Sequence, residues 1–104
     1  MVHVLAFITT KPGMRPDVLA LFNAMVPAVR AEDGCIEYGA VVDLDGAIQT
    51  PIGADRFVVV EKWESLDDLN AHTASAHMAS FAAQAKDMLA ERIIHVMRDA
   101  TLQT

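Results

Sequence analysis

Glu61 and Trp63, two residues apart, are the first candidates for chemistry. They end an apolar run from Phe57 to Trp63 that is typical of a β-strand, so both side chains point to the face that Phe57 and Val59 share. A carboxylate on an apolar face must be paired, hydrogen-bonded or raised in pKa. Glu61 is therefore either a site acid, base or orienting group beside an indole wall, or a strand-end glutamate paired with Lys or Arg at the domain edge. The residues alone favour the edge pair.

His72, His77 and Tyr38 are further polar residues in apolar surroundings. The histidines are five residues apart, which on an uninterrupted helix separates them by about 140°, so they would not share a face. A turn after a short helix could aim His72 inward, where a histidine can act as a base near neutral pH. Each histidine is otherwise a surface or capping residue. Tyr38 either binds a ligand carbonyl or packs with its hydroxyl at the rim.

No sequence motif indicates a metal or phosphate site. The chain has no glycine-rich phosphate loop, no histidine pair at i, i+4 and no nucleophile elbow. His3 and His95 fall on the first and last predicted strands, but a metal site there lacks a third ligand. We therefore predict no metal.

Periodicity and turn residues place these candidates on an α+β framework. Alternation and β-branched residues predict strands over 2–10, 35–42, 57–63 and 93–98. Helical spacing predicts helices from Pro16 to about Arg30, over 66–71 and over 75–91, with Gly34 ending the first and Ser65 capping the second. The order β–α–β–β–α–β predicts a ferredoxin-like, four-stranded antiparallel sheet with the helices on one face, formed by a single domain over 1–104.

Composition restricts the partners. The net charge of −6 and the absence of a Lys/Arg cluster argue against nucleic acid and against an anionic membrane surface. The amino-terminal segment lacks the basic start of a signal peptide and is too short to span a membrane. The single cysteine, Cys35, fits a reducing compartment, so we expect a soluble, cytoplasmic protein.

The apolar content predicts self-association. Apolar residues make up 53% of the chain, more than one small domain needs for its core. Both faces of the strand over 57–63 are largely apolar, since Val58 and Val60 oppose Phe57 and Val59. A second copy of the same sheet is the natural cover, and we expect a homodimer.

Two segments resemble the antibiotic biosynthesis monooxygenase (ABM) domain family. The segment Ala31-Glu-Asp-Gly-Cys-Ile-Glu-Tyr38 is similar to its Glu-x-Gly-Cys-x-x-Tyr pattern at a helix end. The segment Glu61-Lys-Trp-Glu-Ser-Leu-Asp-Asp-Leu-Asn-Ala-His72, followed by His77, is similar to its Glu-x-Trp and Leu-x-x-His pattern with a second histidine. With the first strand and helix, the resemblance covers almost the whole chain.

The resemblance implies a dimeric α+β barrel with a pocket between each sheet and its helices. Some members oxidise phenols or quinols with O₂ and without metal or flavin, which implies no cofactor and a small aromatic substrate. It implies that Trp63 walls the pocket, that His72 is the base or donor, and that Glu61, Tyr38 and His77 orient. The implied apolar lining consists of Phe22, Met25 and Phe81.

Two other functions stay open within this resemblance. One is an isomerase of a small polar ketone, against which the few basic residues near the pocket weigh. The other is a non-enzymatic dimeric binding or stress-related module. Haem degradation is disfavoured, because the resemblance implies that members with that activity carry Asn, Trp and His together, with the Asn on the first strand. The first strand here has His3 and no Asn.

Overall fold

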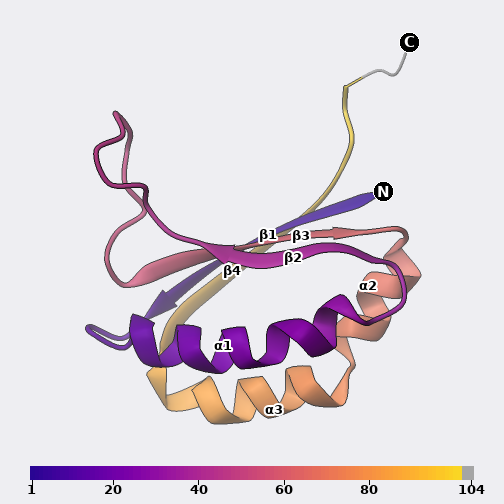
Figure 1. The fold of residues 1–104 in the computed structure, drawn as a ribbon, viewed down its shortest axis with the longest axis horizontal. Helices are drawn as coiled ribbons and strands as arrows, with labels where there is room; N and C mark the ends of the chain where they lie inside the picture. The colour runs from indigo at the N-terminus through magenta and orange to yellow at the C-terminus, as the bar shows by residue number, and fades with distance from the viewer. Residues whose placement is uncertain (102–104) are drawn as a thin grey trace.

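One antiparallel sheet and a layer of helices make up the fold, in a computed structural model that describes residues 1–101 (Figure 1). The elements in chain order are β1 Val2–Thr10, α1 Arg15–Arg30, β2 Cys35–Val41, β3 Arg56–Trp63, α2 Leu66–Thr73, α3 Ala76–Ala85, the 3₁₀ turn η1 Lys86–Met88 and β4 Leu89–Arg98. The strands lie in the order β2-β3-β1-β4. The predicted ferredoxin-like α+β fold is confirmed, with the helical part divided into three helices.

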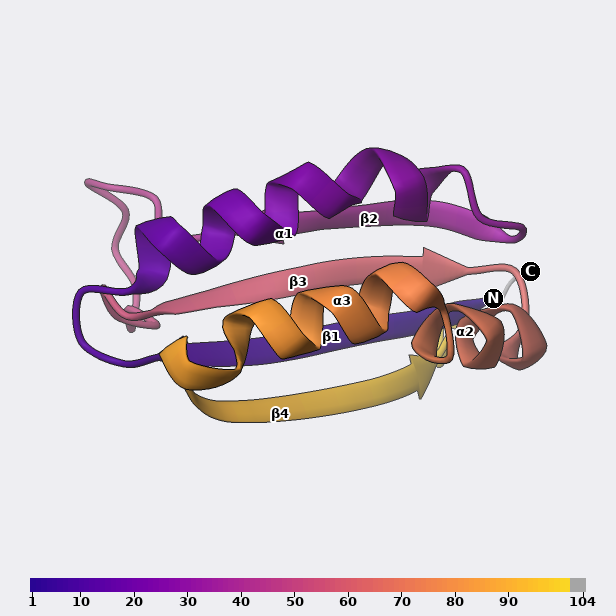
Figure 2. The same cartoon turned by 90° about the horizontal axis from the view of Figure 1, so that it is seen from below.

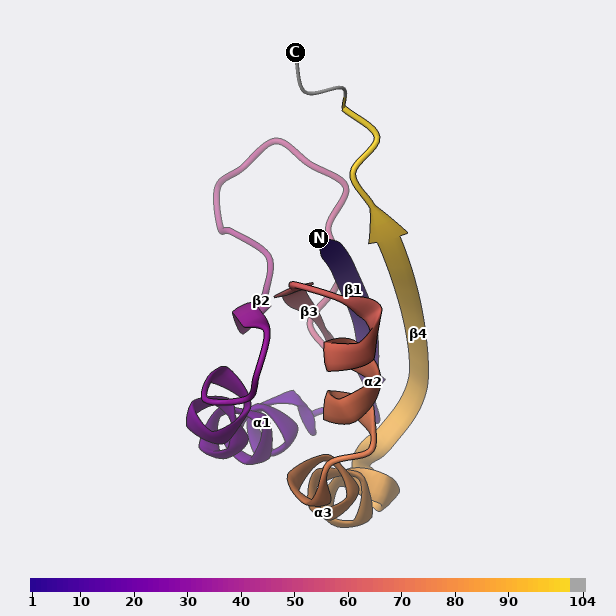
Figure 3. The ribbon, with the colours of Figure 1, turned by 90° about the vertical axis from the view of Figure 1, so that its right-hand side faces the viewer.

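All three helices lie on one side of the sheet (Figures 1 and 3). In Figure 2 α1 runs along β2, whereas α3 lies over β1 and β3, and β4 extends past the helices at the sheet edge. The buried face of β1 is formed by Val4, Ala6 and Ile8. Because β1 pairs with β3 through Val4↔Glu61 and Ala6↔Val59, the side chains of Glu61 and Val59 point to this same helix-covered face.

Apolar packing between α1 and the sheet forms the core. Trp63, Phe22, Phe57, Val18 and Val29 are its largest fully buried side chains. Phe22 stacks on Tyr38 at a ring-centroid distance of 5.3 Å and contacts the rings of Phe57 and Phe81. The core thus fixes the inner surface of β3, where both Glu61 and Trp63 lie.

The predicted helix over 75–91 is wrong at its end. The α-helix stops at Ala85, and β4 begins at Leu89, opposite Thr10 of β1. Met88 and Leu89 fit the apolar arc of a helix, but pairing with β1 along the whole edge satisfies more backbone groups, and tertiary context overrides helical propensity. The longer strand places Arg92 opposite Ile8, on the helix-covered face.

Local turn and cap residues behave as predicted. Gly34 has φ 77°, the left-handed conformation expected after the first helix. Ser65 caps α2 by accepting a hydrogen bond from the amide of Asp68 at 3.2 Å. Ser75 caps α3 in the same way through the amide of Met78 at 3.4 Å, so the chain breaks between α2 and α3.

No helix of the described part of the chain covers the opposite face of the sheet. The 43–55 connection leaves β2 on that side (Figures 1 and 3), with Asp43 accepting hydrogen bonds from the amides of Ile52 and Gly53. Ile93 and Met97 of β4 face outward beside Phe7 and His3 and are well exposed. Among residues 1–101, none of the helices combines the length and apolarity needed to cross a bilayer.

Candidate active site

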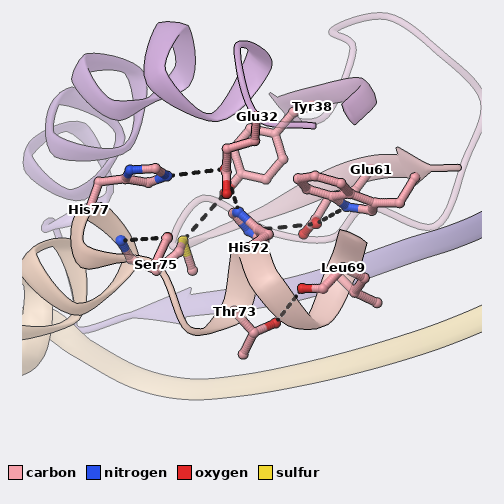
Figure 4. A network of polar contacts seen from close by, with 10 residues as sticks. Glu32, Tyr38, Glu61, Leu69, His72, Thr73, Ser75 and His77 are labelled. Carbon is pink, nitrogen blue, oxygen red and sulfur yellow. Dashed lines mark hydrogen bonds and ion pairs between the residues drawn. The ribbon is translucent and has the colours of Figure 1, made fainter. Parts of the chain in front are cut away.

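Glu61 and Trp63 form a buried hydrogen-bonded pair on the inner face of β3, and Figure 4 shows Glu61 beside His72. The indole Nε1–H of Trp63 donates to Glu61 Oε1 at 2.9 Å, and Trp63 is completely buried. No lysine or arginine is paired with Glu61 among the described residues. Glu61 is therefore an interior carboxylate, and the edge-pair interpretation that the sequence favoured is not what the structure contains.

His72 lies between two carboxylates. Its Nδ1 is 2.9 Å from Glu32 Oε2, and its Nε2 is 4.0 Å from Glu61 Oε1. The imidazole is only 3% exposed and stacks on Trp63 with ring centroids 4.7 Å apart. Because an ionised Glu32 can only accept, the hydrogen bond places the proton on Nδ1 and leaves Nε2 of a neutral ring free to accept another.

The break between α2 and α3 brings His77 to the same carboxylate. Its Nε2 is 3.1 Å from Glu32 Oε2, the oxygen that also accepts from His72 (Figure 4). The sequence expectation that the two histidines would not share a face assumed an uninterrupted helix. Capping by Ser75 starts a new helix, so both rings reach Glu32 from consecutive helices.

Burial changes the acid–base properties of two groups. The pKa of Glu61 is raised, mainly because burial penalises the carboxylate, while the Trp63 hydrogen bond and the nearby His72 act in the opposite direction. The pKa of Tyr38 is raised well above its usual value by burial first, then by the charges of Glu61 and Glu32. Tyr38 thus stays a neutral phenol whose hydroxyl points to the Met78 sulfur at 4.0 Å.

Two cavities adjoin this cluster. An apolar one of about 60 Å³ is lined by aromatic, aliphatic and methionine side chains that include Phe22, Met25, Tyr38 and Phe81. The other, of about 120 Å³, is lined by Glu61, His72, Leu69 and Thr73, among others. Four residues line both cavities: Glu61, Met78, Arg92 and Ile94.

The structure places the predicted site residues in three positions. Glu61, His72 and Tyr38 border the cavities, as do the predicted apolar residues Phe22, Met25 and Phe81. Trp63 lines neither cavity and lies behind Glu61 and His72, because it is fully buried against them. His77 lies on the far side of Glu32, beside a groove between α1 and α3.

Sequence reasoning missed Glu32 and Arg92. Glu32 lies inside the segment quoted for the family resemblance, but it was interpreted there only as part of a helix end. Arg92 was missed because the last strand was predicted to begin at Ile93, so the sequence did not assign the Arg92 side chain to either face of the sheet. Glu32, His72 and His77 also hold ligand atoms within 4.8 Å of one another, which makes them the candidate metal ligands within residues 1–101.

Comparison with known proteins agrees with the fold and the motifs. The family model described as antibiotic biosynthesis monooxygenase (ABM) matches residues 1–84. The chain belongs to the ABM family. Escherichia coli K12 YgiN, named "Probable quinol monooxygenase", is 34% identical over 101 residues, covering 94% of this chain and 97% of that protein.

Solved structures of similar proteins extend the comparison to three dimensions. Rv0793 from Mycobacterium tuberculosis superposes with a TM-score of 0.80 at 28% identity, covering 99% of this chain and 98% of that one. PA3566 from Pseudomonas aeruginosa superposes with a TM-score of 0.82 at 23% identity, covering 96% and 94%, and supports the fold. The ABM fold therefore extends past the matched residues to include β4.

Proposed function

We propose that this ABM protein is a monooxygenase that oxidises a quinol-like or polyketide-like aromatic with O₂, using its own side chains and no cofactor. The observation that carries the proposal is the buried His72, which is oriented by Glu32 and directs its other nitrogen toward Glu61 and the cavity. The name of the YgiN relative supports a quinol as the substrate class.

Removal of a proton is the first chemical requirement. A phenol becomes a much better electron donor to O₂ once it is a phenolate, so the reaction needs a base in a dry site. In our proposal His72 Nε2 accepts the phenolic proton, and Glu32 stabilises the resulting imidazolium through Nδ1. The gap of 4.0 Å between Nε2 and Glu61 Oε1 is too long for a hydrogen bond, and a substrate hydroxyl placed beside Nε2 can donate its one proton to that nitrogen.

Stabilisation of the phenolate is the second requirement. Arg92 is the cation among the residues that line both cavities, so it is our candidate for holding the developing negative charge. Electron transfer to O₂ and recombination at a ring carbon then give a peroxide. Loss of water from it leaves one oxygen atom on carbon: quinol plus O₂ gives a hydroxyquinone plus water.

Room for the ring requires the two cavities to join. Each cavity is smaller than the roughly 300 Å³ of a typical ligand pocket. Met78 lines both, and an unbranched methionine moves at little cost, so its displacement would connect the acid–base cluster to the aromatic lining of Phe22 and Phe81. We assign Trp63 a positioning role, since it stacks on His72 and donates to Glu61.

We also propose that the outer face of the sheet pairs with a second copy of the chain. Val41, Ile93 and Met97 are 50%, 45% and 40% exposed on this face, and Leu5, Phe7 and Val60 lie between them, half-buried. Such a continuous apolar surface is costly in water, and a two-fold dimer covers it twice with one interface.

The test is O₂ uptake by metal-stripped, flavin-free protein with a panel of hydroquinones and anthrones. We expect saturable uptake, with one ¹⁸O atom from ¹⁸O₂ in the product, and a fall in rate of about 10²- to 10⁴-fold in His72→Gln. His95→Gln, which changes a histidine on the outer face, is the matched control and should retain the rate. Uptake no faster than the uncatalysed reaction for the whole panel, or full activity in His72→Gln, contradicts the proposal.

A further inference from the structure

Glu32 and His77 form a polar pair outside the cavities, and the proposed oxidation gives His77 no direct part. His72 and His77 both contact the same carboxylate oxygen, Glu32 Oε2 (Figure 4). We propose that Glu32, His72 and His77 form a binding site for a divalent first-row transition ion such as Zn²⁺, with a fourth position open to solvent.

The separations between the donor atoms suit such an ion. Glu32 Oε2 is 2.9 Å from His72 Nδ1 and 3.1 Å from His77 Nε2, and all the donor atoms lie within 4.8 Å of one another. Tetrahedral bonds of ~2.0–2.1 Å to nitrogen and oxygen place two ligand atoms about 3.3 Å apart. The two oxygen–nitrogen separations differ from this value by only a few tenths of an ångström, and the two imidazole nitrogens lie within 4.8 Å of each other.

The donor set selects the class of ion. Two imidazole nitrogens and one carboxylate oxygen suit Zn²⁺ and neighbouring transition ions, whereas Ca²⁺ and Mg²⁺ prefer oxygen ligands. Three protein ligands are the number found in zinc sites that keep one position for water or a ligand.

The fold brings together three ligands that are distant in sequence or on different helices. Glu32 follows the end of α1, His72 lies in the last turn of α2, and His77 lies in the first turn of α3. On one continuous helix the two histidines would be about 140° apart and could not share an ion. The break capped by Ser75 therefore lets both histidines reach Glu32.

Access to the site comes from the helix side. Side-chain exposure rises from 3% at His72 to 18% at Glu32 and 32% at His77. His77 borders a groove of about 250 Å³ between α1 and α3, lined also by Leu21, Ala28 and Gln84. An ion can enter there without passing through the substrate cavities.

An ion at this site would change the role of His72, a consequence that rests on the proposed function. With a metal on Nδ1, a neutral imidazole carries its proton on Nε2 and can no longer accept one there. The metal-loaded protein is then expected to lose quinol oxidation, and chelation is expected to restore it.

Binding is tested by titrating EDTA-treated protein with Co²⁺ and following the visible d–d absorption of the ion, with Zn²⁺ as the competitor. We expect one Co²⁺ per protomer in a low-coordinate spectrum, displaced by Zn²⁺. His77→Gln and Glu32→Gln should each weaken binding at least about tenfold, the loss that even the supporting partners of metal ligands give. Both residues are partly exposed, so far-UV circular dichroism should confirm that the variants fold.

The matched control is His3→Gln. His3 forms the other close histidine–carboxylate pair of the described residues, with Asp99 at 2.7 Å, and its loss should leave Co²⁺ binding unchanged. Equal affinities in the wild type and His77→Gln, or loss of binding in His3→Gln, would overturn the proposal. The absorption measurement needs no substrate, so the two proposals can fail separately. Co²⁺ binding without any O₂ uptake would refute the proposed function alone. O₂ uptake that Zn²⁺ leaves unchanged, in a protein that does not bind Co²⁺, would refute the metal site alone.

Discussion

On the helix-covered face of the sheet, Glu61 and His72 are 7% and 3% exposed, whereas on the other face Ile93 and Met97 are 45% and 40% exposed. Buried ionisable groups thus lie on the inner side, whereas exposed apolar groups lie on the outer face and, at the inner edge formed by β4, at Ile94 and Val96. Each arrangement is unfavourable for an isolated domain unless something compensates. Inside, the compensation is present, since Trp63 donates a hydrogen bond to Glu61 and His72 is hydrogen-bonded to Glu32.

The outer face has no such compensation within one protomer. Phe7 packs edge-on against His95 with ring centroids 5.9 Å apart, and the rest of the apolar surface is left open. This difference underlies our two proposals, oxidation chemistry on the inner face and pairing with a second copy on the outer face. Each proposal can be tested by substituting one residue on the corresponding face.

The largest effect is expected on the inner face, from Trp63→Ala. Trp63 is completely buried, and its loss removes both core packing and the hydrogen bond to Glu61. We expect the free energy of unfolding to fall by about 3–5 kcal/mol, measured by urea denaturation. Trp63→Phe, which keeps most of the packing, should cost about 1–3 kcal/mol because Glu61 is left without its donor.

Lys62→Ala is the control for this strand. Lys62 points to the opposite face and pairs with Glu37 at 3.1 Å, with both side chains well exposed. We expect a change of less than about 1 kcal/mol. A loss in Trp63→Ala no larger than in Lys62→Ala would mean that the inner face is not held as described.

A smaller effect is expected on the outer face, from Ile93→Asp. If two copies pair through this face, the substitution buries a carboxylate among apolar side chains. The dimer should then weaken by at least about 2 kcal/mol, or roughly thirtyfold in Kd. Sedimentation velocity over a range of concentrations measures this shift, and urea denaturation at low concentration checks that the protomer still folds.

Leu66→Asp is the matched control. Leu66 is 55% exposed at the start of α2, away from the outer face, where an acidic residue is favourable. It should leave the association unchanged. A wild-type protein that sediments as a monomer at all concentrations would contradict the proposal that a second copy covers the outer face.

The sequence was sufficient for features set by neighbouring residues. Alternation in 57–63 placed Glu61 and Trp63 on one face, and Ser65 and Gly34 marked helix ends correctly, because each follows from a local rule. The start of β4 could not be predicted, since Met88 and Leu89 satisfy a helical pattern and only pairing with β1 decides against it.

The candidate site also contains residues that the sequence could identify and contacts that it could not. Glu61 and His72 could be chosen as polar residues in apolar surroundings, although the residues alone favoured an edge pair for Glu61. The meeting of Glu32 with His72 and His77 depends on how the end of α1 lies against a break between two helices. That is tertiary information: the sequence predicted separate helices over 66–71 and 75–91, but not the carboxylate at which the two histidines converge.

The smallest effect is expected from Ser75→Ala, which tests the helix break on the inner side. Ser75 Oγ accepts from the Met78 amide at 3.4 Å and so fixes the first turn of α3, which carries His77. Loss of an N-cap costs about 1 kcal/mol, measurable by urea denaturation. Co²⁺ affinity should fall with it, because a loosened first turn no longer holds His77 against Glu32.

Ser80→Ala is the control. Ser80 lies within α3 and accepts a hydrogen bond only from the exposed Gln84 side chain at 3.2 Å, so the free energy of unfolding should change by less than about 0.5 kcal/mol. If the two variants lose the same stability, the cap is not what holds the break, and the convergence of the histidines must depend on Glu32 itself.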